Sequence, residues 1–258
     1  WFDPVAFHLG PLPIRWYALA YLSCIFYGFL YAKYRYFPKH NLQQADLDPM
    51  MNYLVIGLLV GGRLGHFLFY HPQVIFTNPL LVLQIWQGGM SFHGALIGIG
   101  SALWLFSRRY GYNYWVFTDF VCLVVPFGIF WGRLANFING ELVGRVSDVS
   151  WAVVFPHIDQ LPRHPSQLYE AVTEGLFLFL LLNFIYKKSP RPGVISGSFL
   201  LAYGVIRCWM QTYRVPEYLF HKPILGMDTG QILSLLMVFF GAVLLVCLKH
   251  QEQAHRGN

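Results

Sequence analysis

Charged residues are scarce in this chain. Asp, Glu, Lys and Arg make up 12% of the 258 residues, about half the share of an ordinary globular domain, whereas 56% are hydrophobic and 18% aromatic. Eighteen Lys and Arg with twelve Asp and Glu are too few to cover a soluble domain that also contains long uncharged runs. High hydrophobicity with low charge also excludes a disordered chain. The composition therefore predicts a membrane protein.

Cysteine is also rare, and its spacing excludes two further classes. The four cysteines lie singly in apolar runs, with no C-x-x-C pair and no histidine at metal-ligand spacing. We therefore expect neither a disulfide framework nor a metal site, and no cofactor. The net charge is +6, but the basic residues stand in twos and threes between apolar runs rather than along one stripe. This pattern argues against a nucleic-acid partner. No signal peptide is predicted, because no basic segment precedes the first apolar run.

Long apolar runs fill most of the sequence. A helix needs ~20 apolar residues to cross a bilayer, with ~17 as a lower limit. Seven runs reach that length: Ile14–Tyr31, Asn52–Tyr70, Ser91–Phe106, Phe117–Ala135, Leu168–Tyr186, Ile195–Tyr213 and Gly230–Leu248. The shorter apolar stretch Asn78–Trp86 is predicted to be an interfacial helix. The expected fold is an all-α polytopic membrane protein with about seven transmembrane helices, forming one transmembrane domain over residues 1–258.

Glycines recur at four-residue spacing within three of these runs. They are Gly57, Gly61 and Gly65 in the second run, Gly94 and Gly98 in the third, and Gly128 and Gly132 in the fourth. Small residues at this spacing let helix backbones approach closely in a membrane. We therefore expect these three helices to pack through their glycines.

The distribution of Lys and Arg predicts the orientation of the chain. One side of the membrane receives ten of them: Lys33, Arg35, Lys39, Arg108, Arg109, Lys187, Lys188, Arg191, Lys249 and Arg256. The other side receives five: Arg15, Arg145, Arg163, Arg214 and Lys222. The positive-inside rule then places the N-terminus outside and the C-terminus in the cytoplasm.

The longest connection, residues 136–166, falls on the outer side in this topology. Its segment Trp151–Phe155 has the composition of a short strand, bounded by Asp148 and Pro156. We therefore expect residues 136–166 to form a small extracytoplasmic head.

Three arginines, Arg63, Arg133 and Arg207, lie inside predicted spans. An arginine in the hydrocarbon region costs at least ~2.5–3.5 kcal/mol, so each needs a partner or a polar cavity. The predicted topology puts all three in the outer halves of their helices, at the level of Tyr17 and His93. A planar guanidinium matches a phosphate with two parallel hydrogen bonds, so a phospholipid headgroup is the expected anion. Alternatively, each arginine pairs with Glu141, Glu170, Glu174 or a backbone carbonyl and only holds helices together.

The densest polar stretch runs from Gly132 to Arg145, with the order Gly-Arg, Asn-Phe-x-Asn, Glu and a closing Gly. This order resembles the signature of the bacterial phosphatidylglycerol–prolipoprotein diacylglyceryl transferases. Further stretches resemble that family in the same order along nearly the whole chain: Arg15-Trp16-Tyr17, Gly61-Gly62-Arg63, the segment from Gly88 to Gly94, the segment from Pro162 to Glu170, and Tyr203-Gly204-x-x-Arg207.

The resemblance implies an enzyme of the bacterial inner membrane that carries out the first step of lipoprotein maturation. It would move the diacylglyceryl group of phosphatidylglycerol onto the lipobox cysteine of a prolipoprotein and release glycerol phosphate. The family's functional positions correspond here to Tyr17, His93, Arg133, Asn136, Glu141, Gly144, Tyr203 and Arg207. The chain departs from the usual pattern at Gln211, where the family has a glutamate one turn after Arg207, and at Gln87 and Ala95.

The chemistry implied by the resemblance gives these residues roles. Arg133 and Arg207 would hold the phosphodiester and stabilise the charge that develops on the leaving phosphate, without a metal. His93, with a reference pKa of ~6.5, would deprotonate the substrate thiol, whose own pKa is ~8.5. Alternatively, a neutral His93 would only bind the phosphate. Tyr17 and Asn136 would position the headgroup, and Glu141 would orient an arginine.

Two other functions are open from the sequence. A lipid or anion transporter would use the arginines for binding alone, and it predicts internal repeats, of which the sequence has none. An intramembrane hydrolase would need a serine–histidine pair, for which Ser91 with His93 and Ser166 with His164 are available. Neither serine lies in a Gly-x-Ser-x-Gly elbow, and Ser166 is expected to cap the helix that follows it.

Overall fold

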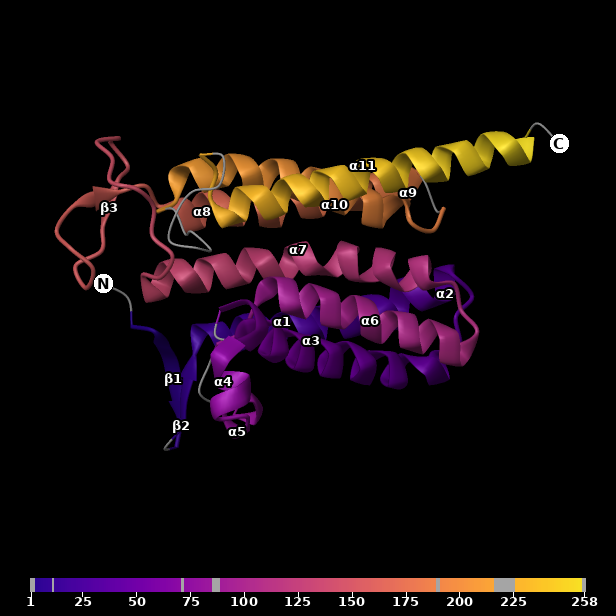
Figure 1. The fold of residues 1–258 in the computed structure, drawn as a ribbon, viewed down its shortest axis with the longest axis horizontal. Helices are drawn as coiled ribbons and strands as arrows, with labels where there is room; N and C mark the ends of the chain where they lie inside the picture. Colours follow the sequence, from indigo (N-terminus) through magenta and orange to yellow (C-terminus); the bar gives the residue numbers. More distant parts are fainter. Residues whose placement is uncertain are drawn as a thin grey trace. The chain divides into compact units, whose positions relative to one another are not determined.

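The computed structural model describes residues 3–10, 12–70, 72–84, 89–188, 191–215 and 226–256. Helices make up most of these residues, so the all-α fold class is confirmed (Figure 1). The first half contains β1 (Val5–Leu9), β2 (Leu12–Arg15), α1 (Trp16–Tyr31), η1 (Ala32–Tyr36), α2 (Phe37–Lys39), η2 (Gln44–Asp46), α3 (Leu47–Tyr70), α4 (Pro72–Thr77), α5 (Leu80–Leu83) and α6 (Phe92–Tyr110). The second half contains α7 (Tyr114–Asn139), β3 (Val153–Val154), β4 (Pro162–Arg163), α8 (Ser166–Glu170), η4 (Ala171–Phe177), α9 (Leu178–Lys188), α10 (Val194–Met210), η5 (Gln211–Tyr213) and α11 (Thr229–Arg256).

Each of the seven apolar runs coincides with a helix or, for α8, η4 and α9, with a continuous helical stretch. Among the described residues, four helical stretches are long and apolar enough to cross a membrane: Gln44–Leu68, Tyr114–Asn139, Ser166–Lys188 and Gly230–Gln251. Helices α1 and α10 are shorter, with 16 and 17 residues. These stretches make the chain a multi-pass membrane protein.

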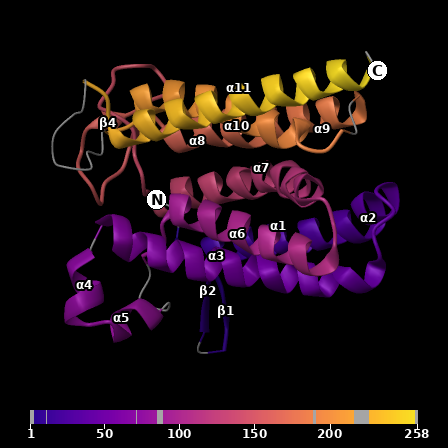
Figure 2. The ribbon, with the colours of Figure 1, turned by 45° about the vertical axis from the view of Figure 1, so that its right-hand side comes forward.

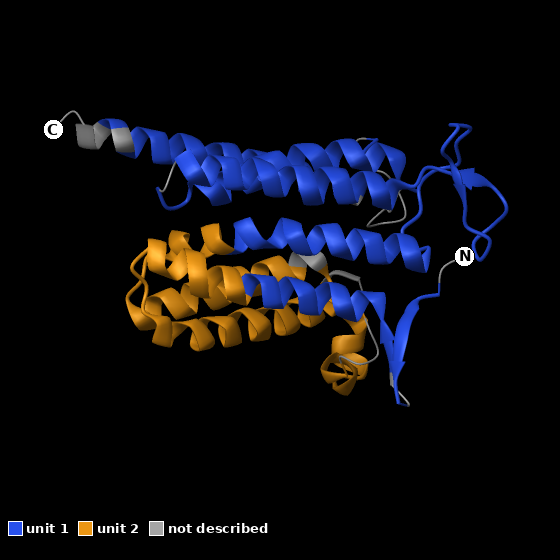
Figure 3. Cartoon of the chain, turned by 180° about the vertical axis from the view of Figure 1, so that it is seen from behind, with its two compact units in different colours: residues 1–28, 121–258 blue, residues 29–120 orange. Residues whose placement is uncertain are grey.

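The described chain divides into two compact units, coloured separately in Figure 3. Unit 1 comprises residues 1–28 and 121–258, and unit 2 comprises residues 29–120. The long helices α1 and α7 each contribute residues to both units.

Glycines bring two helices of unit 2 into backbone contact, as predicted. Helices α3 and α6 lie side by side (Figure 2). A Cβ atom built on Gly57 would lie 2.7 Å from the carbonyl oxygen of Gly98, and one on Gly61 would lie 2.6 Å from the Gly98 Cα atom. Side chains at these positions would therefore force the two helices apart.

The glycines of α7 behave differently from one another. A Cβ atom on Gly128 would meet the Cys24 sulfur of α1 at 2.5 Å, so this glycine does allow close packing within unit 1. Gly132 has no described atom within 4 Å of the position a Cβ would occupy. Among the described residues, close packing of α7 is therefore seen at Gly128 and not at Gly132.

Two other local features differ from the expectations. Strands β1 and β2 pair antiparallel, and Gly10, which directly follows β1, adopts φ +61°. Ser166 does not cap α8, because Pro165 holds the N-cap position and the Ser166 hydroxyl donates to the Leu142 carbonyl at 3.3 Å. The apolar stretch from Asn78 does contain a short helix, α5, although residues 85–88 lie outside the described part of the chain.

A strand was predicted over Trp151–Phe155, and the structure has a two-residue strand there, β3. Strand β3 pairs antiparallel with β4, with Val153 opposite Arg163 and Val154 opposite Pro162. Residues 136–166 thus form a small structure with its own β-pairing between α7 and α8.

Candidate active site

The C-terminus of α7 ends in a Schellman turn that reverses the chain. Gly140 adopts φ +67°, and its N–H donates to the Phe137 carbonyl at 3.1 Å. The Glu141 N–H donates to the Asn136 carbonyl at 2.9 Å. Glycine is favoured at this position because it adopts a left-handed conformation without a steric penalty. The turn therefore places the Glu141 side chain beside Asn136.

Asn136 forms hydrogen bonds with two other predicted site residues of unit 1, Tyr17 and Glu141. It is buried, and its amide nitrogen donates to the Tyr17 hydroxyl at 2.5 Å and to the Glu141 carboxylate at 3.3 Å. The same carboxylate accepts from the Asn139 amide at 3.3 Å. The described hydrogen bonds of the Glu141 carboxylate are with these two asparagines, whereas the sequence predicted that it orients an arginine.

Two buried carboxylates lie on the helical stretch that follows the loop. Glu170 ends α8 and Glu174 lies within η4, which is a π-helical segment. Both side chains are 0% exposed. π-Helical turns within α-helices are frequently found at functional sites. Burial of two carboxylates is costly unless cations accompany them.

Arg133 of α7 and Arg207 of α10 supply those cations. Arg133 Nε lies 2.9 Å from Glu170 Oε2, and its Nη2 lies 3.2 Å from Glu174 Oε2. Arg207 Nη1 lies 2.8 Å from Glu170 Oε1 and 3.1 Å from Glu174 Oε1. Each carboxylate therefore bridges the two arginines with its two oxygens.

Arg133 and Arg207 each have guanidinium N–H groups that are not used in the ion pairs with Glu170 and Glu174. Within the described part of the chain, Arg133 Nη1 and the Nε and Nη2 atoms of Arg207 contact no protein acceptor. The two side chains remain 16% and 14% exposed. These donors are directed by fixed guanidinium planes, which suits them to bind an oxyanion.

A third arginine, Arg214, joins the same cluster. Its side chain is buried, and its Nη1 lies 3.6 Å from Glu170 Oε1. Three guanidiniums therefore lie within 4 Å of these two carboxylates. We call these five residues the arginine–glutamate network: Arg133, Glu170, Glu174, Arg207 and Arg214.

Gly144 lies where three chain segments meet. A Cβ atom built on it would lie 2.8 Å from the His164 Cβ and 2.9 Å from the Tyr213 carbonyl oxygen. Gly144 also forms an antiparallel bridge with Arg214. Only glycine fits between these two segments, so the predicted importance of Gly144 has a steric basis.

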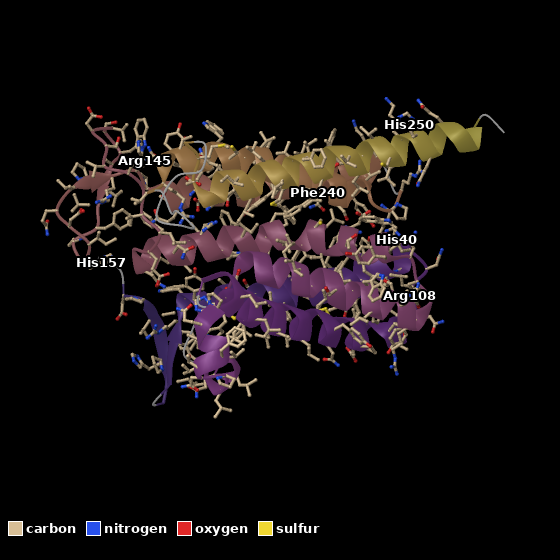
Figure 4. The ribbon with its side chains drawn as sticks, in the orientation of Figure 1. His40, Arg108, Arg145, His157, Phe240 and His250 are labelled. Carbon is tan, nitrogen blue, oxygen red and sulfur yellow. The ribbon has the colours of Figure 1, made fainter. Side chains whose placement is uncertain are left out.

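Polar side chains link different parts of the head to one another. Arg163 Nη1 donates to the Gly144 carbonyl at 3.1 Å and also pairs with Asp159, and this ion pair holds the pKa of the Asp159 carboxyl below its usual value. His157 Nε2 lies 3.0 Å from the Gly140 carbonyl oxygen. Arg145 and His157 lie at one end of unit 1, and His250 lies at the other end (Figure 4).

Arg63 lies in unit 2 and binds carbonyl groups. Its guanidinium donates to four backbone carbonyls, those of Leu81, Val82, Gln84 and Gly89, at 2.6–3.2 Å. It also lies over the Phe67 ring, 4.7 Å from its centroid. These contacts agree with the alternative in which an intramembrane arginine has a structural role and binds backbone carbonyl groups.

Two predicted residues complete the list. His93 is the second residue of α6, and its side chain lies outside the described residues. Tyr203 is buried one turn before Arg207 on α10, and its ring stacks on Phe199 with centroids 5.4 Å apart. Residues i and i+4 share a helix face, so Tyr203 lies on the face of α10 that carries the network.

The sequence interpretation missed Arg214 and gave the two glutamates only a structural role. Arg214 follows the sixth apolar run and was counted as an outer-loop charge. Glu170 and Glu174 carry a signal that could have identified them, because carboxylates four residues apart in an apolar span are as costly as arginines.

The hydroxyls of Ser91 and Ser166, the serines of the two candidate serine–histidine pairs, form hydrogen bonds with the backbone. Ser91 caps α6 and accepts from the Gly94 N–H at 3.2 Å. His164 Nδ1 contacts the Tyr169 hydroxyl at 3.2 Å, whereas the Ser166 hydroxyl donates to a carbonyl. Among the described residues, no group of three His, Cys, Asp or Glu side chains could hold a metal ion. The arrangement in unit 1 is therefore suited to anion binding and electrostatic stabilisation.

Comparisons with known proteins agree with this chemistry. A family model described as prolipoprotein diacylglyceryl transferase matches residues 4–247. A relative from Nitrosospira multiformis is 46% identical over 95% of this chain and 86% of its own length. Another, from Aromatoleum aromaticum, is 46% identical over 98% of both chains. Both are named phosphatidylglycerol–prolipoprotein diacylglyceryl transferase. The match extends from β1 into α11, and the chain belongs to the prolipoprotein diacylglyceryl transferase family.

Proposed function

We propose that this enzyme transfers the diacylglyceryl group of phosphatidylglycerol to the lipobox cysteine of prolipoproteins. The observation that carries the proposal is the arginine–glutamate network, in which Arg133 Nη1 and the Nε and Nη2 atoms of Arg207 contact no described protein acceptor. A phosphodiester carries one negative charge and offers oxygens that match a guanidinium fork. The names of the relatives support the same substrates.

The chemical step needs stabilisation of the leaving group above all. The cysteine thiolate attacks the glycerol carbon that bears the phosphate, a C–S bond forms, and the C–O bond breaks. The bonding electrons stay on the oxygen, so glycerol phosphate leaves with one more negative charge than the phosphodiester had. We propose that Arg133 and Arg207 meet this charge with Arg133 Nη1 and Arg207 Nε and Nη2. Preorganised donors of this kind are typically worth ~10²–10³ in rate each.

The other predicted residues prepare the substrates. We assign His93 as the base that takes the thiol proton, since its reference pKa of ~6.5 suits proton transfer near neutral pH. Tyr17, Asn136 and Glu141 form a hydrogen-bonded group that would position the headgroup. Tyr203 and Gly144 would shape the surroundings of the network.

Arg63 would act on the backbone that leads to His93. Its hydrogen bonds to carbonyls between Leu81 and Gly89 hold the segment before α6. Ser91 N–H also donates to the Gly62 carbonyl at 2.9 Å, beside Arg63. We therefore propose that Arg63 positions this segment during substrate binding.

For the topology, we propose seven transmembrane helices in the bacterial inner membrane, with the N-terminus outside and the C-terminus in the cytoplasm. The seven helices at the predicted apolar runs and the ten-to-five bias of Lys and Arg support this topology. The positions of Arg145 and His250 at opposite ends of unit 1 agree with it (Figure 4). Residues 136–166 would then form an extracytoplasmic head.

A direct assay tests the function. Purified protein in detergent would be mixed with phosphatidylglycerol and a peptide that contains a lipobox cysteine. Mass spectrometry should then find a thioether-linked diacylglyceryl group on the peptide, together with free glycerol phosphate. A peptide with serine in place of the cysteine is the control and should remain unmodified. If instead the peptide stays unmodified and reconstituted protein moves phosphatidylglycerol between leaflets, the transporter alternative holds.

A further inference from the structure

Glu174 contacts both of the arginines to which the proposed function assigns the lipid phosphate. Its Oε1 lies 3.1 Å from Arg207 Nη1, and its Oε2 lies 3.2 Å from Arg133 Nη2. The side chain is 0% exposed. In the described part of the chain, Glu174 forms ion pairs with these two arginines, whereas Glu170 also lies 3.6 Å from Arg214 Nη1. Glu174 is therefore the carboxylate whose contacts are confined to this pair.

The π-helical segment η4 brings the backbone beside Glu174 close to α7. Gly175 is the next residue, and a Cβ atom built on it would lie 2.7 Å from the Cα atom of Phe130. Phe130 lies three residues before Arg133 on α7. Because the two backbones nearly touch at this level, a side chain as short as glutamate reaches Arg133 on α7 as well as Arg207 on α10.

The network contacts the two guanidiniums through different groups. Arg133 uses Nε and Nη2, which lie along one edge of the planar guanidinium, and each of them contacts one glutamate. Arg207 uses Nη1 alone, which lies against Oε1 of both glutamates. The edge formed by Nε and Nη2 is thus occupied in Arg133, whereas in Arg207 it contacts no described protein acceptor. Such an edge matches two oxygens of a phosphate with two parallel hydrogen bonds.

We infer that Glu174 is a positioning residue for the transfer reaction. It fixes the two guanidiniums so that Arg207 binds the phosphate with its unoccupied edge, while Arg133 Nη1 meets the oxygen that leaves. The inference rests on the proposed function, in which a lipid phosphate binds these arginines. Glu174 acts through the arginines and does not itself touch the lipid. Without Glu174 each guanidinium would lose one of its anchors, and its donors would no longer be preorganised for the developing charge.

A structural role alone gives little reason to bury this carboxylate. A buried ion pair often adds no stability over apolar side chains of similar volume, because the desolvation cost offsets the attraction between the charges. Donors held in place before the reaction, in contrast, stabilise the negative charge that appears when glycerol phosphate leaves. Positioning by Glu174 therefore affects the rate of transfer, which an apolar contact between the same helices would not do.

The test separates lipid binding from the rate of transfer. Glu174→Gln keeps the size of the side chain but replaces one acceptor oxygen by an NH2 group, so one arginine loses its partner. Glu174→Asp keeps the charge and withdraws the carboxylate by one methylene. Thr173→Val is the matched control, because it removes a hydrogen bond of 2.7 Å, from the Thr173 hydroxyl to the Tyr169 carbonyl, that involves neither arginine.

Each full-length protein would be purified in detergent for three measurements. Fluorescent phosphatidylglycerol without peptide gives the dissociation constant of the lipid. Initial rates with saturating phosphatidylglycerol and lipobox peptide give kcat. Thermal melting followed by circular dichroism gives the stability of each variant, so a loss of rate can be compared with a loss of stability.

The two Glu174 variants should bind the lipid but transfer it slowly. Glu174→Gln and Glu174→Asp should each lower kcat by ~10²-fold, because a lost preorganised donor costs ~10²–10³ in rate and a misplacement of ~1 Å can cost ~10². The dissociation constant should stay the same or fall in Glu174→Gln, since a carboxylate that competes with phosphate for the arginines has been removed. Thr173→Val should keep the parent kcat, even if it melts at as low a temperature as the Glu174 variants.

Three results would overturn the inference: full kcat in either folded Glu174 variant, a defect explained wholly by weaker lipid binding, or an equal loss of kcat in Thr173→Val. If Glu174→Gln does not fold, Glu174→Asp decides, because it keeps the charge of the ion pairs. A parent protein that binds phosphatidylglycerol but never modifies the peptide would refute the proposed function itself. An active parent with fully active Glu174 variants would refute this inference and leave the proposed function standing.

Discussion

Arg207 Nη1 lies 2.8 Å from Glu170 Oε1, although 37 positions separate the two residues in the chain. The contact shows which carboxylates pair with Arg207. The family pattern has a glutamate one helical turn after this arginine, and this chain has Gln211 there. Glu170 and Glu174 supply Arg207 with carboxylates from a neighbouring helical stretch. The Gln211 side chain is buried and lies against Gly230, at the start of α11.

Glu170→Gln should destabilise the protein strongly. The substitution removes one partner from buried arginines, and breaking a buried ion pair typically costs ~3–5 kcal/mol. The free energy of unfolding in detergent, followed by circular dichroism, measures this loss. Asp159→Asn is the control, since Asp159 pairs with Arg163 in the head on the surface, and its loss should matter far less. Equal effects of the two substitutions would show that the network does not hold the helices of unit 1 together.

Arg133→Lys and Arg207→Lys should each lower transfer activity by ~10² or more, although both proteins should still insert and accumulate. Lysine keeps the positive charge but lacks the planar fork that binds two oxygens at once. Initial rates with the lipobox peptide measure the effect, with expression checked by immunoblot. Full activity in either variant would mean that charge alone suffices at these two positions.

The helices were predictable from the sequence because a bilayer requires long apolar runs, and each of the seven runs lies wholly or largely in helix. The contacts at Gly57, Gly61 and Gly98 followed from their spacing. The pairing of β1 with β2 was not predicted, and the end of β2, Ile14 and Arg15, was assigned to the first span. Gly132 has the spacing of a packing glycine, but spacing does not say which side of a helix meets a neighbour.

His93→Gln tests the source of the thiolate. If His93 accepts the thiol proton, the variant should lose ~10²–10⁴ in transfer rate at neutral pH. The defect should shrink between pH 7 and pH 9, because the thiol itself ionises with a pKa of ~8.5. Steady-state rates across that range, each divided by the parent rate, provide the measurement. A defect that stays constant with pH would instead assign His93 to phosphate binding.

Gly61→Ala should weaken the packing of α3 on α6. The added methyl group would overlap the backbone of Gly94 and Gly98, and overpacking of this kind typically costs ~1–3 kcal/mol. Gly132→Ala is the matched control, because it adds the same group to a helix where no described atom lies within 4 Å. Alanine should raise helix stability there by up to ~1 kcal/mol. Thermal melting in detergent should therefore move in opposite directions, and parallel shifts would contradict the contact between α3 and α6.

The orientation can be tested with topology reporters. A reporter fused after Asn258 should be active in the cytoplasm, and one inserted at Val149 should be active outside, because ten of the fifteen Lys and Arg outside the spans lie on the predicted inner side. Alkaline phosphatase and green fluorescent protein fusions distinguish the two compartments. Exchange of the two results would remove the basis for placing the site near the outer surface.

The site was only partly predictable. The motif from Gly132 to Arg145 identified Arg133, Asn136 and Glu141, and the structure brings the last two together. The partners of the arginines were harder to predict, because ion pairs between helices depend on how the helices pack. Arg214 could not be recognised, since its burial follows from pairing with Gly144 across 70 residues of sequence.

The position of Gly144 between His164 and Tyr213 has a consequence for protein engineering. The backbone of residues 144–146 bridges to Arg214 on one side and to Arg163 on the other, so the head shares its β-pairing with the segment that ends α10. A chimaera that exchanges residues 136–166 alone would set a foreign surface against the native Tyr213 and Arg214. Heads from two members of this family are therefore interchangeable only when residues 211–215 are transplanted with them.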